Sequence, residues 1–310
     1  MSLARSLKTL SKEEIRAFVA SIDYVLTDCD GVLWKELTPI DGSAKVLSLL
    51  KSMGKKVFYV TNNSTKTREE YVSKFEKLGF SASKEEIVGT ARIVATYLKD
   101  KNFTGKAYLI GSKGLGNELS AAGIDFFGLG PDPVQTDNLP EVFDAKFEKD
   151  VSAVVVGFDL HISYPKLLKA ATFLSNPKCL FVATNTDEVF PAACDNTVPG
   201  TGTLVAAVET CSQRKAQIIG KPSTLMFSAL AKEHNIDPKR AIMIGDRAKS
   251  DILFGKNVGM TTLLVYTGVN SKEDVEMWQT SLDPSDKLLI PDYTLDSLGD
   301  LLPLLENLTK

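Results

Sequence analysis

The chain has 310 residues, of which 44% are hydrophobic and 24% are charged, and its formal net charge is −3. These values are ordinary for a folded globular protein, and at roughly 100–200 residues per domain the length suggests two domains, or one domain with a large insertion. The charge provides no basic excess to neutralise a nucleic-acid backbone, so we expect no nucleic-acid partner.

Short apolar segments alternate with helical patterns along the chain. Strands are expected at residues 24–26, 57–60, 154–156, 180–182, 218–219, 241–244 and 263–265. Helices are expected over 44–50 before Gly54, over 71–78 before Gly79, and from Ser163 as N-cap with Pro165 in the first turn. Runs this short and apolar suit strands that are buried on both faces. The alternation predicts a parallel α/β sheet with right-handed crossovers.

The middle of the chain has a different composition. Residues 128–150 are rich in Gly, Pro and Asp, which is typical of a loop, and they lie within a block with strands and helices of its own. We therefore predict a core domain formed by residues 1–103 and 210–310, interrupted by a second α/β domain at residues 104–209.

Two carboxylates follow the first predicted strand. Asp28 and Asp30 are two residues apart, so in an extended chain their side chains point the same way. Open α/β sheets bind ligands at the carboxyl ends of their strands, and a divalent cation relieves the repulsion between close carboxylates. An Asp-x-Asp pair by itself is more often part of a surface turn.

Three further polar motifs follow later strands. They are Thr61-Asn62-Asn63-Ser64, Gly220-Lys221-Pro222, and Gly245-Asp246-Arg247 with Asp251 five residues on. Each has an ordinary explanation as a helix start, a loop lysine or a turn. Together with Asp28 and Asp30 they supply a nucleophile, an acid–base group, a metal site and a phosphate clamp, which phosphoryl transfer requires.

Other metal and membrane chemistry is not expected. The four cysteines (residues 29, 179, 194 and 211) form no Cys-x-x-Cys pair, and the two histidines are His161 and His234, so we expect neither a zinc site nor a disulfide framework. No run approaches the ~18 apolar residues of a membrane span, and the N-terminus lacks the apolar region of a signal peptide. We expect a cytoplasmic protein with no membrane partner.

These motifs resemble, in order and spacing, those of the haloacid-dehalogenase superfamily of phosphatases. The chain looks like the capped branch that contains phosphoglycolate, pyridoxal and p-nitrophenyl phosphatases. The matching segments are 28–34, 61–64, 220–223, 245–247 and Pro199–Thr203, where the cap rejoins the core. The resemblance implies a Rossmann-like parallel-sheet core with an inserted α/β cap domain, and a homodimer formed through that cap.

The resemblance also implies residue roles. Asp28 would attack phosphorus to form an aspartyl-phosphate, and Asp30 would protonate the leaving oxygen and then activate water. Mg²⁺ would be held by Asp28, the backbone carbonyl of Asp30 and Asp246, and Asp251 would lie just outside these ligands. The groups expected to bind the phosphoryl oxygens are Thr61, Asn62, Asn63 and Lys221. The expected substrate is a small phosphorylated metabolite of the phosphoglycolate type, with p-nitrophenyl phosphate as a good artificial substrate.

The chain departs from this branch at two places. Residues 248–251 read Ala-Lys-Ser-Asp, where the branch has Leu, an acidic or polar residue and then Thr before the Asp, so Lys249 adds a cation close to the metal loop. Segment 184–191 resembles the substrate-specificity loop, from which we expect Asp187, Glu188 and Phe190 to contact substrate. Pyridoxal phosphatases have a histidine where this chain has Phe190, which disfavours pyridoxal phosphate as the substrate.

Three other functions fit the sequence less well. A dehalogenase needs the nucleophilic Asp but no acid two residues later, so Asp30 argues against it. A phosphoacceptor signalling domain is about half this length and lacks an inserted domain. A non-enzymatic binding protein is disfavoured because no residue of the expected catalytic set is missing.

Overall fold

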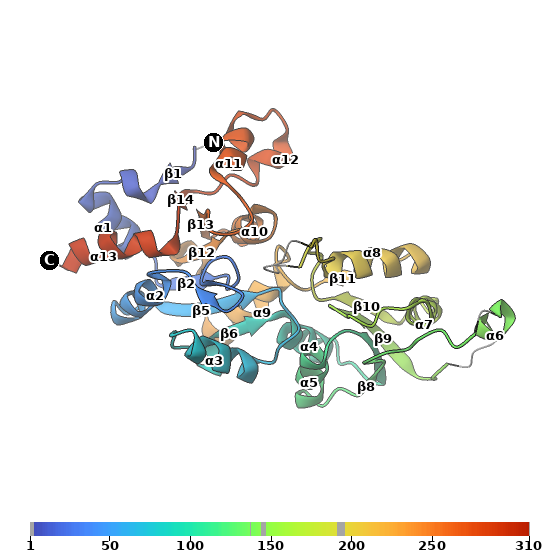
Figure 1. The fold of residues 1–310 in the computed structure, drawn as a ribbon. Helices are drawn as coiled ribbons and strands as arrows, with labels where there is room; N and C mark the ends of the chain where they lie inside the picture. The colour runs from blue at the N-terminus through green and yellow to red at the C-terminus, as the bar shows by residue number, and fades with distance from the viewer. Residues whose placement is uncertain (1–2, 137, 144–146, 191–195, 310) are drawn as a thin grey trace. The chain divides into compact units, whose positions relative to one another are not determined.

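The computed structural model describes residues 3–136, 138–143, 147–190 and 196–309, and these form two compact units. The first unit comprises residues up to 61, residues 68–88 and residues from 221 onward; the second comprises residues 62–67 and 89–220 (Figure 1). The predicted inserted block, 104–209, lies within the second unit, and its limits stay a prediction. Cys194 and Pro191 lie outside the described residues.

The first unit is built on a seven-stranded sheet in the order β1-β14-β13-β12-β2-β5-β6. The strands are β1 (Arg5–Ser6), β14 (Tyr293–Leu295), β13 (Thr261–Val265), β12 (Ala241–Gly245), β2 (Tyr24–Thr27), β5 (Lys56–Thr61) and β6 (Ile87–Gly89). All pairings from β1 to β5 are parallel. The predicted parallel α/β sheet is confirmed.

Apolar side chains bury both faces of this sheet. Leu263 and Val265 of β13 belong to one cluster with side chains of α1, α2 and α13, whereas Leu264 packs on the other side with Val275 and Trp278 of α11. This alternation is the two-residue period of a strand. The helices of this unit are α1 (Lys12–Ser21), α2 (Ser43–Ser52), α3 (Arg68–Lys77), α9 (Leu225–His234), α10 (Leu253–Val258), α11 (Lys272–Thr280), α12 (Pro284–Lys287) and α13 (Leu301–Thr309).

Two short features flank the carboxyl ends of β2 and β12. An antiparallel hairpin of β3 (Trp34–Lys35) and β4 (Thr38–Pro39) follows β2. A π-helix, Ala248–Ile252, follows β12 and leads directly into α10. Single π-helical turns are rare and often occur at functional sites.

The second unit has its own five-stranded parallel sheet, in the order β11-β10-β9-β7-β8. Its strands are β7 (Lys106–Ile110), β8 (Phe126–Phe127), β9 (Val151–Val156), β10 (Leu180–Ala183) and β11 (Gln217–Ile218). Its helices are α4 (Thr90–Asp100), α5 (Lys113–Ala121), α6 (Leu139–Phe143), α7 (Tyr164–Leu174) and α8 (Thr201–Ser212). The predicted second α/β assembly is therefore present.

The predicted element ends are confirmed where local chemistry sets them. Ser163 is the N-cap of α7 and its hydroxyl accepts a hydrogen bond from the Lys166 N–H, and Gly79 adopts a φ of +80° just beyond α3. The strand predicted at 218–219 was misplaced by one residue, because Ile219 lies beyond the end of β11. Among the described residues, no helix is long and apolar enough to cross a membrane.

Candidate active site

The acidic motifs that contain Asp28 and Asp246 lie at the carboxyl ends of two neighbouring strands. β2 pairs with β12, with Thr27 beside Ile244, and the chain continues from β2 towards β5 but from β12 towards β13. The strand order therefore reverses between β2 and β12, and α/β sheets bind ligands at such a switch point. Asp28 and Asp246 are the residues that directly follow these two strands. The Asp28 N–H donates to the Ile244 carbonyl at 2.8 Å, so the pairing extends to the nucleophile candidate itself.

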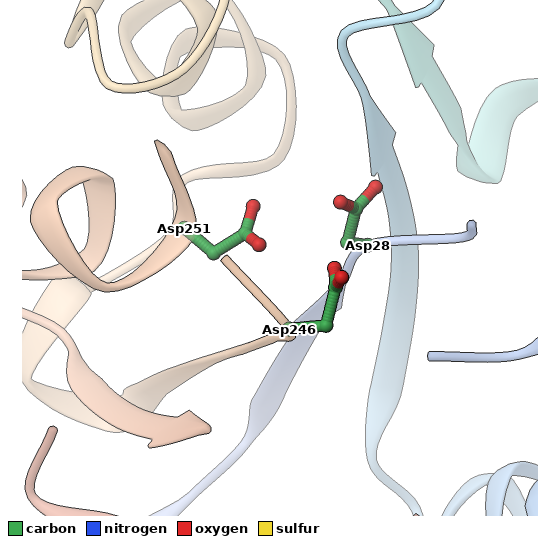
Figure 2. Close-up of side chains that lie close together, drawn as sticks. All are labelled: Asp28, Asp246 and Asp251. Carbon is green, nitrogen blue, oxygen red and sulfur yellow. The ribbon is translucent and has the colours of Figure 1, made fainter. Parts of the chain in front are cut away.

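Three carboxylates converge at this point. Asp28, Asp246 and Asp251 each offer an oxygen, and these oxygens all lie within 4.8 Å of one another. Figure 2 shows the three side chains directed towards a common space. Asp251 comes from the π-helix, and its Oδ2 accepts a hydrogen bond from the Arg247 N–H at 3.0 Å.

Lys221 is the cation that faces this acidic cluster. Its Nζ lies 3.1 Å from Asp28 Oδ1 and 2.7 Å from Asp251 Oδ1, and it donates to the Val60 carbonyl at 2.9 Å. Burial alone would lower the pKa of Lys221, but the charges of Asp251 and Asp28 outweigh burial and raise this pKa above its ordinary value. Lys221 is therefore charged, and it joins the ends of β2, β5 and the π-helix.

The carboxylates carry more negative charge than one lysine offsets. Burial raises the pKa of Asp28 well above its ordinary value, and Lys221 opposes this rise. Burial, followed by the charge of Asp251, raises the pKa of Asp246 to about 7. Close buried carboxylates favour the protonated form when no further cation is present. The site is consequently a high-energy arrangement that a bound cation would stabilise.

Glycines allow the chain to approach Asp246 closely. A Cβ at Gly268 would overlap with the Asp246 carboxylate, and one at Gly31, whose φ is +82°, would also lie too close to it. The next residue, Val269, donates its N–H to Asp246 Oδ2 at 2.8 Å. The Asp246 carboxylate is thus fixed by backbone on one side and open towards Asp28 on the other.

The donor set fits Mg²⁺. The converging groups are hard carboxylate oxygens, which Mg²⁺ prefers, and the cluster holds neither thiolate nor imidazole. The buried Oδ1 of Asp251 also lacks an aligned hydrogen-bond donor among the described residues, although it forms an ion pair with Lys221. The predicted ligand set of Asp28, the Asp30 carbonyl and Asp246, with Asp251 just outside it, stays a prediction.

The family follows from comparison with known sequences. Models of haloacid dehalogenase-like hydrolases match residues 25–125 and residues 76–259, and a model described as HAD-hydrolase-like matches residues 218–301. The second of these spans more than half of the chain and includes both Lys221 and the Asp246 loop. This chain is a haloacid dehalogenase-like hydrolase.

Two curated relatives with extensive similarity to this hydrolase bear the names of phosphatases. Human glycerol-3-phosphate phosphatase is 43% identical over 305 residues, which is 96% of this chain and 95% of the human protein. Phosphoglycolate phosphatase 2 of Arabidopsis thaliana is 40% identical over 304 residues, covering 96% of this chain and 98% of the plant protein. The coverage is nearly complete on both sides, so the resemblance includes both units. The hydrolase is therefore a phosphatase of this family.

Solved structures share the fold. The p-nitrophenyl phosphatase from Archaeoglobus fulgidus matches with a TM-score of 0.76 and 27% identity, covering 91% of this chain and 98% of the archaeal chain. A glycerol phosphate phosphatase from Mycobacterium tuberculosis, solved in complex with magnesium, matches with a TM-score of 0.74 and 25% identity, covering 91% of this chain and 77% of that one. The predicted capped fold is confirmed.

The predicted phosphate-binding residues of the hydrolase divide between its two units. Thr61 is buried at the end of β5 in the first unit, with its hydroxyl 3.5 Å from that of Tyr71. Asn62 and Asn63 belong to the second unit. Asn62 donates from Nδ2 to the Asp187 carboxylate at 3.2 Å, and Asn63 Oδ1 accepts from the Thr65 N–H at 2.9 Å. Their role in binding phosphate stays a prediction.

The predicted specificity loop lies in the second unit of the hydrolase. Asp187 accepts the hydrogen bond from Asn62, and the Phe190 N–H donates to the Val198 carbonyl at 2.8 Å. The ring of Phe190 packs on that of Phe158, with centroids 4.6 Å apart. Glu188 is exposed. Whether Asp187, Glu188 and Phe190 meet substrate stays a prediction.

Sequence analysis missed several contacts that shape this site. The Val60 carbonyl and the Val269 N–H act through their backbone, so their side chains say nothing of these contacts. Trp34 and Lys74 reach the Asp30 carboxylate. Trp34 lies in the 28–34 motif, so an aromatic N–H donor four residues after Asp30 was a readable signal. Nothing in the sequence distinguishes Lys74 from Lys77, the other lysine of α3.

Proposed function

We propose that the hydrolase is a Mg²⁺-dependent phosphatase that hydrolyses small phosphate monoesters through an aspartyl-phosphate on Asp28. The observation that supports this proposal most is the convergence of three carboxylates and one buried lysine at the switch point between β2 and β12. Phosphoryl transfer depends chiefly on positioning and on charge stabilisation, and this group is arranged to provide both.

Asp28 is held ready as the nucleophile. Its Oδ1 accepts a hydrogen bond from the Cys29 N–H at 2.7 Å and lies 3.1 Å from Lys221 Nζ, so the carboxylate cannot rotate freely. Lys221 also favours the ionised form, which a nucleophile requires. When bound, Mg²⁺ would supply positive charge that keeps these carboxylates ionised and that offsets the charge of the phosphoryl group.

Asp30 transfers the protons in this mechanism. As a carboxylate oxygen of Asp28 bonds to phosphorus, the bond from phosphorus to the leaving oxygen breaks, and that oxygen takes a proton from Asp30. Water then gives a proton to the Asp30 carboxylate and bonds to phosphorus, and the bond to Asp28 breaks to release phosphate. Both residues return to their starting states.

The substrates that we propose are small alkyl phosphates such as glycerol 3-phosphate and phosphoglycolate. The support is that relatives at 43% and 40% identity over nearly the whole chain bear the names of phosphatases for these two esters. Phe190 occupies the position at which the resemblance implies a histidine in pyridoxal phosphatases, so we rank pyridoxal phosphate below them.

The proposal is tested by phosphate release from p-nitrophenyl phosphate and glycerol 3-phosphate, with Mg²⁺ and with EDTA. We expect turnover only with Mg²⁺. When the reaction with phosphoryl-labelled substrate is quenched with acid, the label should remain on the wild-type protein but not on Asp28→Asn. Asp28→Asn should remain folded and lose activity by several orders of magnitude. Turnover that survives complete removal of metal, or an active Asp28→Asn protein, would contradict this mechanism.

A further inference from the structure

The Asp30 carboxylate is anchored through one of its two oxygens. Trp34 Nε1–H donates to Asp30 Oδ1 at 2.8 Å, and Lys74 Nζ lies 3.4 Å from the same Oδ1. Trp34 begins β3, just after the turn that carries Asp30, whereas Lys74 comes from the separate helix α3. Two donors from different elements thus converge on a single oxygen of the proposed acid–base residue.

Both donors are held firmly. Trp34 is fully buried, and its ring packs edge-to-face on Phe75 and Phe80 with centroid distances of 4.8 Å and 5.6 Å. Lys74 is the neighbour of Phe75 on α3, and its Nζ lies 4.4 Å from the centre of the Trp34 ring. A lysine above an indole ring is held by a cation–π interaction, which strengthens as the ammonium loses water. The side chain of Lys74 is only 13% exposed.

We propose that Lys74 is a positioning residue for proton transfer by Asp30, an inference that rests on the phosphatase function proposed above. With Oδ1 bound by Trp34 and Lys74, the carboxyl plane is fixed and Oδ2 is the oxygen that carries the proton. Oδ2 gives this proton to the leaving oxygen as the ester bond breaks, and it takes one from water in the second step. Transfer requires the two heavy atoms to lie within roughly 2.6–3.2 Å, so loss of the anchor should slow it.

A purely structural role for Lys74 gives a different expectation. If the lysine only stabilises α3 against Trp34, its loss should lower the amount of folded enzyme and affect all substrates equally. If Lys74 positions Asp30, the fall in kcat/KM caused by its substitution should depend on how much the leaving group needs a proton. p-Nitrophenolate leaves readily without a proton, whereas the alkoxide of glycerol 3-phosphate does not.

The experiment compares Lys74→Met with the wild type on these two esters, using kcat/KM because it reports the step that expels the leaving group. We expect kcat/KM for glycerol 3-phosphate to fall roughly tenfold more than that for p-nitrophenyl phosphate, a fraction of the effect of complete acid–base catalysis. Lys74→Arg keeps a cation that can stack on Trp34, and should recover most of the loss. The matched control is Lys77→Met, an exposed lysine on the same helix, which should change neither value.

The possible outcomes distinguish failure of the positioning role from failure of the proposed phosphatase function. An active wild type whose Lys74→Met variant loses kcat/KM equally on both esters, or loses none, overturns the positioning role and leaves the phosphatase function intact. A wild type that hydrolyses neither ester overturns the function and the inference together. Thermal unfolding of each variant, measured alongside, shows whether an equal loss on both esters is a loss of folded protein.

Discussion

Lys221 is the buried cation on which the acidic cluster depends, and Lys221→Met removes its charge while keeping most of its volume. In the wild type, its Nζ lies 3.1 Å from Asp28 Oδ1 and 2.7 Å from Asp251 Oδ1, and the lysine side chain is 1% exposed. Methionine leaves both carboxylates without this partner. We therefore expect the free energy of unfolding to fall when no divalent metal is present.

The magnitude follows from the burial of the three groups. Removing one partner of a buried ion pair typically costs about 3–5 kcal/mol. The side chain of Asp28 is 17% exposed, so it retains some solvation, whereas that of Asp251 is fully buried. We expect a loss of about 3 kcal/mol at neutral pH, which corresponds to roughly 5 °C in Tm for a chain of 310 residues at the usual unfolding entropy per residue.

The direction of the pH dependence is also determined. Burial already raises the pKa of Asp28, and loss of Lys221 removes the charge that opposes this rise. A carboxyl whose pKa is higher in the folded than in the unfolded protein loses stability as pH rises between the two values. The deficit of Lys221→Met should therefore be smaller at pH 5 than at pH 7.5.

The assay is urea unfolding in EDTA at these two pH values. The control is Lys215→Met, which removes a surface ion pair with Glu209 from a lysine side chain that is 88% exposed, and should change the free energy by less than about 0.5 kcal/mol. A Lys221→Met deficit as small as that of the control would refute the buried ion pairs. A large deficit that is equal at both pH values would show that packing, and not charge, is lost.

Three further outcomes are expected. In EDTA the wild type should lose stability as pH rises from about 4 to about 7, by up to about 4 kcal/mol through Asp246, whose folded-state pKa is about 7. Unfolding of Asp246→Asn over the same range should show a smaller slope, because Asp28 still contributes. Gly268→Ala places a Cβ against the Asp246 carboxylate and should weaken Mg²⁺ binding by roughly 10–100-fold in calorimetric titration, so unchanged affinity would argue against Asp246 as a ligand. Phe190→His should shift the ratio of kcat/KM towards pyridoxal phosphate and away from phosphoglycolate, because imidazole can donate a hydrogen bond that a phenyl ring cannot; a constant ratio would exclude Phe190 from substrate choice.

The features that sequence predicted well are those that neighbouring residues decide. The strands at 24–27, 241–245 and 261–265 are recognisable because a buried strand needs a short run of branched apolar residues. The N-cap at Ser163 and the left-handed Gly79 follow from local hydrogen bonding and backbone sterics. The polar residues after these strands were therefore predicted as site candidates.

Short strands were missed because their own residues do not determine them. β1, β8 and β14 have two or three residues each, and they are strands through pairing with a neighbour that lies far away in the sequence. Propensity over so few residues is weak beside the packing that a neighbouring strand provides.

The tertiary structure alone decided which side chains meet. Asp28 lies near Asp246 because β2 pairs with β12, and the π-helix turns Asp251 towards Lys221. The sequence shows only that each of these residues comes after a strand. The contact of Lys74 with Asp30 likewise depends on how α3 packs against the buried Trp34. Sequence patterns record which face of an element is apolar, but distances between elements arise from packing over the whole core, so the chemistry of this site was readable from the chain and its geometry was not.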